Sequence, residues 1–139
     1  MKKEVVSKKS SAAIGPYSHG IEFGNLVFVS GQIGVDPKTN NLFEGIKEQT
    51  KQALVNLKNV LEAGKSDINN VLKTTVYLAD MNDFPIMNEV YATFFKKPYP
   101  ARATIQVTKL PKGALVEIEC MAYRKDKKGC CDEGCQCNC

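Results

Sequence analysis

Arg102 is the first residue whose type and setting suggest chemistry. It lies in the stretch YPARATIQV, in a chain that carries seventeen lysines and only two arginines. A guanidinium is a planar fork that can form two parallel hydrogen bonds with a carboxylate, whereas an ammonium offers only a point charge. The position raises the question of which anion such a fork would hold. A plain surface charge is the alternative explanation.

Other small polar groups lie at the ends of the elements that the sequence predicts. Each has a structural explanation of its own: a half-buried aromatic, a strand-end hydroxyl beside a glycine, an exposed helix residue, and a carboxylate in an interface salt bridge. Spacing along the chain does not by itself bring these groups together. They are Tyr17, Ser30 with Gly31, Asn88 and Glu117.

Most familiar catalytic constellations are absent from the sequence. The single histidine, His19, lies in the turn-like stretch IGPYSHG and is expected to face solvent. A His-rich metal site or a Ser-His-Asp relay cannot be assembled without it. The chain has neither GxxxxGK[ST] nor GxGxxG, so nothing supports a nucleotide cofactor.

Length and charge limit the function classes. At 139 residues the chain fits one domain with a single core. The net charge of +4 comes from the two ends, and residues 11–123 balance eleven basic against eleven acidic side chains. A balanced body disfavours tracking of a nucleic-acid backbone. The start MKKEVVSKKSS lacks the apolar core of a signal peptide, and no apolar run is long enough to span a membrane, so we expect a cytoplasmic protein.

The first half of the chain predicts a hairpin, a loop and a helix. IEFGNLVFVSG reads as two strands around the turn Gly24-Asn25, the second ending near Ser30-Gly31. QIGVDPKTNNLFEG is predicted to be a loop of the length often reserved for function. Apolar residues then recur at helical spacing over 44–63, with Gly64 where a C-terminal cap belongs.

The second half predicts a strand at 71–80, a helix that begins after Asp83 and ends before Pro98, and strands at 103–109 and 115–124. The resulting order is β-β-β-α-β-α-β-β, with the strands in one sheet and both helices against one side. In the last strand Val116, Ile118, Cys120 and Ala122 form a core face. The other face carries Glu117 and Glu119 between apolar residues, which favours contact with another subunit.

The C-terminal residues differ in composition from the rest. Five of the six cysteines, Cys130, Cys131, Cys135, Cys137 and Cys139, fall in the last ten positions. We therefore divide the chain into a domain at 1–125 and a cysteine-rich tail at 126–139, expected to be a flexible appendage. Thiolates at such density could bind Zn²⁺ or Cu⁺, and a redox-labile tail without a dedicated role is the alternative.

Several motifs, in order and spacing, resemble the RidA family (YjgF/YER057c/UK114) of enamine/imine deaminases. They are IGPYS, VFVSGQIGVDP, KTTVYLADMNDFPIMNEVYATFF, PARATIQV and LPKGALVEIE, and the resemblance covers about residues 12–124. It implies an α+β chorismate-mutase-like fold, a mixed sheet with two helices on one face. It also implies a homotrimer whose sheets form an inner barrel, with active sites between subunits.

The resemblance also implies an activity and roles for residues. Family members hydrolyse reactive 2-imino or enamine acids, such as 2-iminobutanoate and 2-iminopropanoate from pyridoxal-phosphate-dependent dehydratases, to 2-oxo acids and ammonia, without a cofactor of their own. Arg102 matches the arginine that holds the substrate carboxylate, and Glu117 the glutamate that positions the attacking water. Tyr17, Ser30, Gly31 and Asn88 match pocket positions. Thr104, which stands where some relatives have cysteine, is expected to be a further substrate-binding position.

Two other functions stay open on the sequence alone. Some relatives are described as ribonucleases or translation inhibitors, and the balanced charge of the body disfavours that role here. A chaperone-like trimer that binds small ligands is the third alternative.

Overall fold

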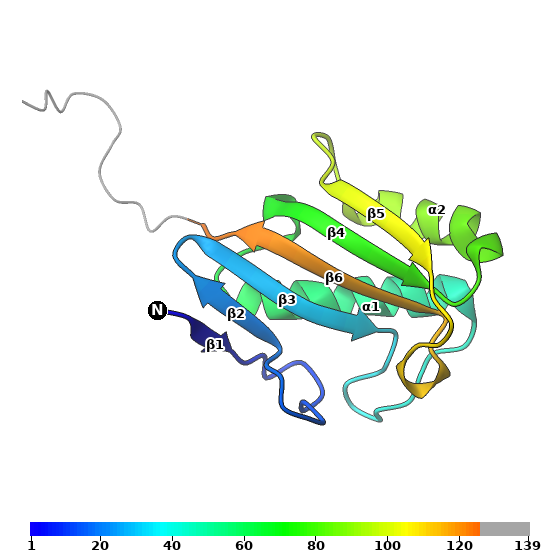
Figure 1. Ribbon diagram of the computed structural model, residues 1–139, viewed down its shortest axis with the longest axis horizontal. Coiled ribbons are helices and arrows are strands. Elements are labelled where there is room, and N and C mark those ends of the chain that lie inside the picture. The colour runs from blue at the N-terminus through cyan, green and yellow to red at the C-terminus, as the bar shows by residue number, and fades with distance from the viewer. Residues whose placement is uncertain (126–139) are drawn as a thin grey trace, which may run out of the picture.

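The computed structural model describes residues 1–125 and shows the predicted order of elements (Figure 1). The cysteine cluster of the tail lies outside the described residues. The predicted domain boundary at 125 coincides with their limit and stays a prediction. No helix within the described range is long and apolar enough to cross a membrane. The elements are β1 (Lys3–Val5), β2 (Gly20–Phe23), β3 (Leu26–Ile33), α1 (Gly45–Ala63), β4 (Val71–Leu78), α2 (Phe84–Phe94), β5 (Ala101–Gln106) and β6 (Val116–Tyr123).

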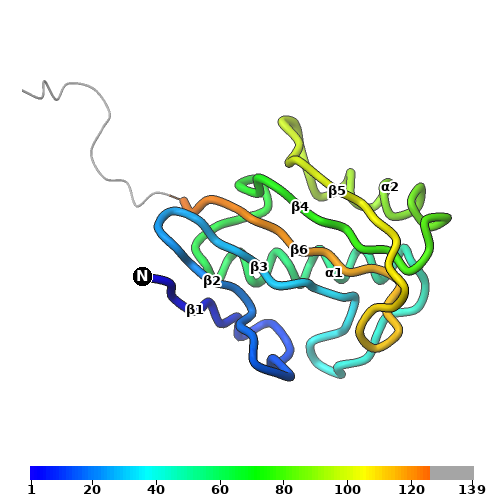
Figure 2. The backbone as a smooth tube through the Cα atoms, in the orientation of Figure 1, coloured from blue at the N-terminus to red at the C-terminus, as the bar shows by residue number. Residues whose placement is uncertain are grey.

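The six strands of the described part of the chain belong to one mixed sheet with the spatial order β1-β2-β3-β6-β4-β5. Among the strands of residues 1–125 only β4 and β5 run parallel, as expected for strands that a helix connects, and the other pairs are antiparallel. Strand β6 is inserted between β3 and β4, so two strands that follow one another in sequence, β5 and β6, are not neighbours (Figure 2). The last strand thereby joins the two halves of the sheet.

Both helices cover the same face of the sheet, as predicted (Figure 1). The apolar stripe of α1 supplies Leu54, Leu57 and Leu61, which are fully buried against the strands. On β6 the predicted alternation is confirmed, because Val116, Ile118, Cys120 and Ala122 are all buried. Each fully buried leucine stabilises the fold by about 2 kcal/mol, so this one-sided core accounts for much of the folding free energy.

The opposite face of the sheet has no covering element among residues 1–125. Phe28, Ile105 and Tyr123 keep 39%, 47% and 42% of their surface exposed. Glu117 and Glu119 lie between them on β6 and are half-buried. An uncovered face with this mixture of aromatic, aliphatic and acidic side chains is typical of a surface that meets another subunit.

The bounds of four strands differ from the prediction. Strand β4 ends at Leu78 and does not reach residue 80. Strand β3 does not end at Ser30-Gly31 but continues through a bulge to Ile33, because β6 goes on pairing beyond the irregularity. Strand β5 occupies 101–106 instead of 103–109, since its parallel pairing with β4 starts at Lys73↔Ala101 and fixes its register. Strand β6 is shorter by one residue at each end.

The helix ends are only partly as predicted. Gly64 is the C-terminal cap of α1, but the left-handed conformation typical of such caps is adopted by Lys65, with φ of 59°. Asp83 occupies the N-cap position of α2 without a side-chain hydrogen bond. The capping carboxylate is instead that of Asp80, which accepts from the Asn82 amide at 2.9 Å and caps the short turn before α2.

Candidate functional site

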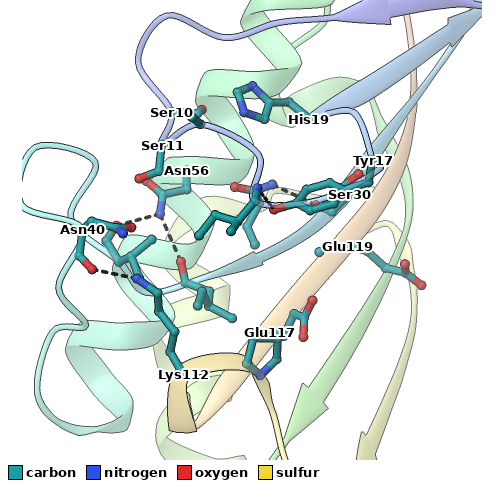
Figure 3. A pocket seen from close by; sticks show the side chains of 17 residues that line it. Ser10, Ser11, Tyr17, His19, Ser30, Asn40, Asn56, Lys112, Glu117 and Glu119 are labelled. Carbon is teal, nitrogen blue, oxygen red and sulfur yellow. Dashed lines mark hydrogen bonds between the residues drawn. The ribbon is translucent and has the colours of Figure 1, made fainter.

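A cavity of about 570 Å³ lies at the end of the uncovered sheet face where β3 and β6 meet the loops (Figure 3). Its walls come from the segment before β2, the bulge of β3, the loop that follows β3, and the turn before β6. Four of the predicted site residues line it, namely Tyr17, Ser30, Gly31 and Glu117. The predicted functional loop also contributes, through Val35 and Asn40.

The bulge in β3 fixes one wall of the cavity. The register passes from Val29↔Cys120 to Gln32↔Ile118, so Ser30 and Gly31 are left without a regular partner on β6. The Ser30 hydroxyl donates to the Ser18 carbonyl at 2.6 Å, and the Ser30 amide donates to the His19 carbonyl at 3.0 Å. These two bonds hold the segment that carries Tyr17 against the sheet. Because its proton is engaged, the Ser30 hydroxyl can offer a ligand an acceptor.

Glu117 reaches across β6 into the space that Gly31 leaves open. An added Cβ at Gly31 would overlap a carboxylate oxygen of Glu117 and lie 2.8 Å from its Cδ. No side chain other than hydrogen leaves Glu117 in this position. The glycine therefore has a steric role in the site, and the backbone freedom of glycine is not the reason for it.

We expect Gly31→Ala to displace the Glu117 carboxylate and to lower any activity that depends on it, by about tenfold or more, with little change in stability. The clash involves the end of a flexible side chain, which can rotate away, so the fold should be preserved. Turnover and the thermal unfolding midpoint, measured on the same preparation, check this. A large decrease in the unfolding midpoint would contradict the explanation that only the Glu117 side chain moves. Gly15→Ala is the control, because its added methyl group meets only ordinary van der Waals contacts.

The electrostatic setting of Glu117 favours proton exchange. Burial raises the pKa of the Glu117 carboxyl, and the negative charge of Glu119 raises this pKa further. Glu119 is held by the Tyr77 hydroxyl, which donates to Oε1 of Glu119 at 2.9 Å. Lys112 and His19 are the other ionisable groups in the wall besides Tyr17. A carboxyl in this position can accept and return a proton more readily at neutral pH than an exposed one.

Tyr17, His19 and Lys112 complete the rim. Tyr17 is 54% exposed, and its hydroxyl accepts from the Ile14 amide at 3.4 Å. The sequence predicted that His19 faces solvent, but the side chain is half-buried. Its Nδ1 accepts from the Ser7 amide at 3.2 Å, which holds the ring against the segment that follows β1. Lys112 donates to the Asn40 carbonyl at 2.9 Å and links the two loops over the cavity.

Several residues that line the cavity were not predicted from the sequence. Lys112 and Asn40 both have left-handed backbones, with φ of 58° and 59°, which a sequence indicates only weakly for a lysine. Glu119 could be expected from its alternation with Glu117 along β6. Nothing in the pattern pointed to the remaining polar residues, which are Ser10, Ser11, Gln32 and Asn56.

The three other predicted site residues, Asn88, Arg102 and Thr104, lie elsewhere. Arg102 and Thr104 are on β5, opposite Thr74 and Val76 of β4, which are buried beneath the helices. Their side chains therefore belong to the helix-covered face. Asn88 is exposed on α2, the helix that packs next to this edge.

The Arg102 guanidinium lies over two aromatic rings of α2 and pairs with no carboxylate among residues 1–125. Its Cζ is 4.6 Å from the ring centroid of Tyr91 and 5.5 Å from that of Phe84. The other arginine, Arg124, is ion-paired with Glu22 at 3.2 Å. Arg102 is thus a cation whose hydrogen-bonding capacity is available to an anion.

One chain therefore contains two separate halves of the predicted site. Tyr17, Ser30, Gly31 and Glu117 share the cavity on the uncovered face. The Arg102 group lies on the other face, two strands away from β6 at the β5 edge, which is a lateral distance of about 10 Å. Within residues 1–125 no three potential metal ligands converge, and the tail cysteines lie outside this range.

The fold and cavity define a class: a single-domain α+β protein with a one-sided core and a small acidic-polar site on its open sheet face. The chain belongs to the family whose model is described as Endoribonuclease L-PSP, the YjgF/RidA family, which matches residues 7–124. The resemblance drawn from the sequence motifs is thereby confirmed.

Individual relatives agree over almost the whole described chain. The 2-iminobutanoate/2-iminopropanoate deaminase of Mus musculus is 49% identical over 125 residues, 89% of this chain and 93% of that protein. The crystal structure of RidA from Psychrobacter sp. PAMC 21119 superposes with a TM-score of 0.85 at 45% identity, covering 87% of this chain and 98% of the other. Escherichia coli TdcF with bound serine has a TM-score of 0.84 at 37% identity, covering 88% and 99%.

Proposed function

We propose that this protein hydrolyses 2-imino acids, such as 2-iminobutanoate and 2-iminopropanoate, to 2-oxo acids and ammonia, at sites formed between adjacent copies of a homotrimer. The observation that carries the proposal is the division of the site into two halves. One half offers a carboxyl group for proton transfer, and Lys112, the lysine in its wall, is engaged with the Asn40 carbonyl. The other offers the Arg102 guanidinium, which pairs with no carboxylate among residues 1–125.

Relatives support both parts of the proposal. The mouse protein is named as a deaminase of these two imino acids, and the structure of TdcF is described with bound serine, an amino acid that carries the carboxylate expected of a ligand for Arg102. The uncovered sheet face supports assembly, because a neighbouring copy would bury Phe28 and Ile105 and could bring its own Arg102 to the cavity.

The reaction that follows from these groups is short. Arg102 of one copy binds the substrate carboxylate through two parallel hydrogen bonds and so orients the imine carbon. Glu117 of the other copy accepts a proton from water as the water oxygen adds to that carbon. The proton passes to nitrogen and gives a carbinolamine. Glu117 then carries the proton of the carbinolamine hydroxyl group to nitrogen, and ammonia leaves as the carbon–nitrogen bond breaks and the carbonyl forms. Water and imino acid are consumed, and one 2-oxo acid and one ammonia are released.

The test is to couple a threonine dehydratase to this protein and follow the release of 2-oxobutanoate. The intact chain should accelerate release above the spontaneous rate, and Glu117→Gln should lose about a hundredfold of that acceleration because an amide cannot accept the proton. Glu48→Gln, an exposed position on α1, is the matched control and should retain full activity. If the intact chain gives no acceleration, the proposed function is wrong.

A further inference from the structure

Arg102 is held by a set of contacts that the chemistry of the reaction does not require. Tyr91 lies beneath the guanidinium at 4.6 Å, and Phe84 lies on the same side of α2, two turns earlier, at 5.5 Å. Both distances are within the range of a cation–π interaction. The guanidinium is thus positioned by rings rather than by a carboxylate.

The Tyr91 ring is itself fixed. It is 6% exposed and packs against Phe95 with ring centroids 4.3 Å apart. Its hydroxyl shares a 2.8 Å hydrogen bond with the hydroxyl of Thr74, which is fully buried. Burial raises the pKa of the Tyr91 phenol, so the ring stays neutral near pH 7 and the hydroxyl bond is kept.

These contacts form a closed loop around Arg102. Thr74 is the residue of β4 that lies opposite Arg102 in the parallel ladder. The backbone of Arg102 therefore lies beside that of Thr74, the side chain of Thr74 is hydrogen-bonded to Tyr91, and the ring of Tyr91 contacts the guanidinium. We therefore expect a displacement of the Tyr91 ring to change the position of the guanidinium.

We propose that Phe84 and Tyr91 are positioning residues for Arg102: their rings occupy the flat side of the guanidinium and leave its N–H groups for a ligand carboxylate. A carboxylate partner would compete with the ligand for the same donors, whereas a ring face does not. Holding a long side chain in place before binding also removes part of the entropic cost of binding. This inference rests on the proposed role of Arg102 and names the residues that act through it.

The experiment uses the two arginines as signal and internal control. In ¹⁵N-labelled protein the Nε–H groups of Arg102 and Arg124 give two side-chain resonances, which Arg102→Lys assigns. We expect Phe84→Leu, which keeps apolar bulk but removes the ring face, to raise the mobility of the Arg102 Nε–H and leave Arg124 unchanged, because Arg124 is held by Glu22. The dissociation constant for 2-oxobutanoate should rise about threefold to tenfold.

Tyr91→Phe separates the ring from its hydroxyl. It keeps the cation–π contact and removes the bond to Thr74, so it should have a smaller effect than Phe84→Leu on both readouts. Unchanged Arg102 mobility in Phe84→Leu, or higher mobility with unchanged affinity, would overturn the inference. A folding defect would appear in the Arg124 signal as well. None of these readouts needs turnover, so a failed deaminase assay and a failed positioning role give different results.

Discussion

A one-to-one mixture of Arg102→Ala and Glu117→Gln chains is expected to regain about a quarter of the wild-type deaminase activity, although each variant alone is nearly inactive. In a homotrimer with sites between chains, each site takes Arg102 from one copy and Glu117 from the next. Random mixing makes about one site in four intact, because each contributor has an even chance of being the undamaged type. The measurement is turnover after the two chains are refolded together.

The control for this experiment pairs two lesions in the same half of the site. Gly31→Ala and Glu117→Gln both damage the cavity on the uncovered face, so their mixture should recover nothing beyond the activities of its components. Native mass spectrometry establishes that mixed oligomers have formed. If the Arg102→Ala and Glu117→Gln chains form mixed oligomers but no activity is recovered, both residues act from the same chain. That result would contradict a site divided between two copies.

Gly34→Ala is expected to destabilise the protein by about 3 kcal/mol or more, a large effect for the addition of one methyl group. An added Cβ at Gly34 would lie 2.5 Å from the Cα of Gln49 and 2.6 Å from its carbonyl oxygen. Both atoms belong to the backbone of α1, which cannot rotate away as a side chain can. The loop after β3 would have to move off the helix.

Further contacts depend on the close approach of the loop after β3 to α1. The Gln49 side chain donates to the Phe43 carbonyl at 2.8 Å and accepts from the Leu115 amide at 2.8 Å, so it links the loop to the start of β6. Denaturant unfolding at a fixed protomer concentration measures the loss. Gly15→Ala, which meets only Tyr17 at 3.6 Å, is the control, and an equal change in both variants would contradict the backbone clash.

Elements with a clear period were predictable from the sequence. The stripe of α1 and the alternation of β6 were confirmed because each reflects contact with a single core. The insertion of β6 between β3 and β4 was not predicted, since pairing between distant strands leaves no local pattern. The end of β3 was misplaced for a related reason: a bulge continues a strand past residues that locally indicate a turn.

The site was predictable only through the family resemblance. Spacing along the chain does not tell that Arg102 and Glu117 belong to opposite faces of one sheet, because β5 and β6 are separated by β4 and not joined as a hairpin. The aromatic platform under Arg102 also could not be predicted. Phe84 and Tyr91 fit a helical core stripe equally well, and only the register of β5 against β4 brings the guanidinium to them.

The position of β6 has a consequence for how the protein is made. During synthesis β1–β3 and β4–β5 emerge before β6, the strand that lies between them. Until Val116–Tyr123 is available, β3 and β4 each present an unpaired edge, and unpaired edges invite association with other chains. A nascent chain of this protein is therefore expected to be most exposed to aggregation just before β6 is complete, and folding of the sheet must largely wait for that strand.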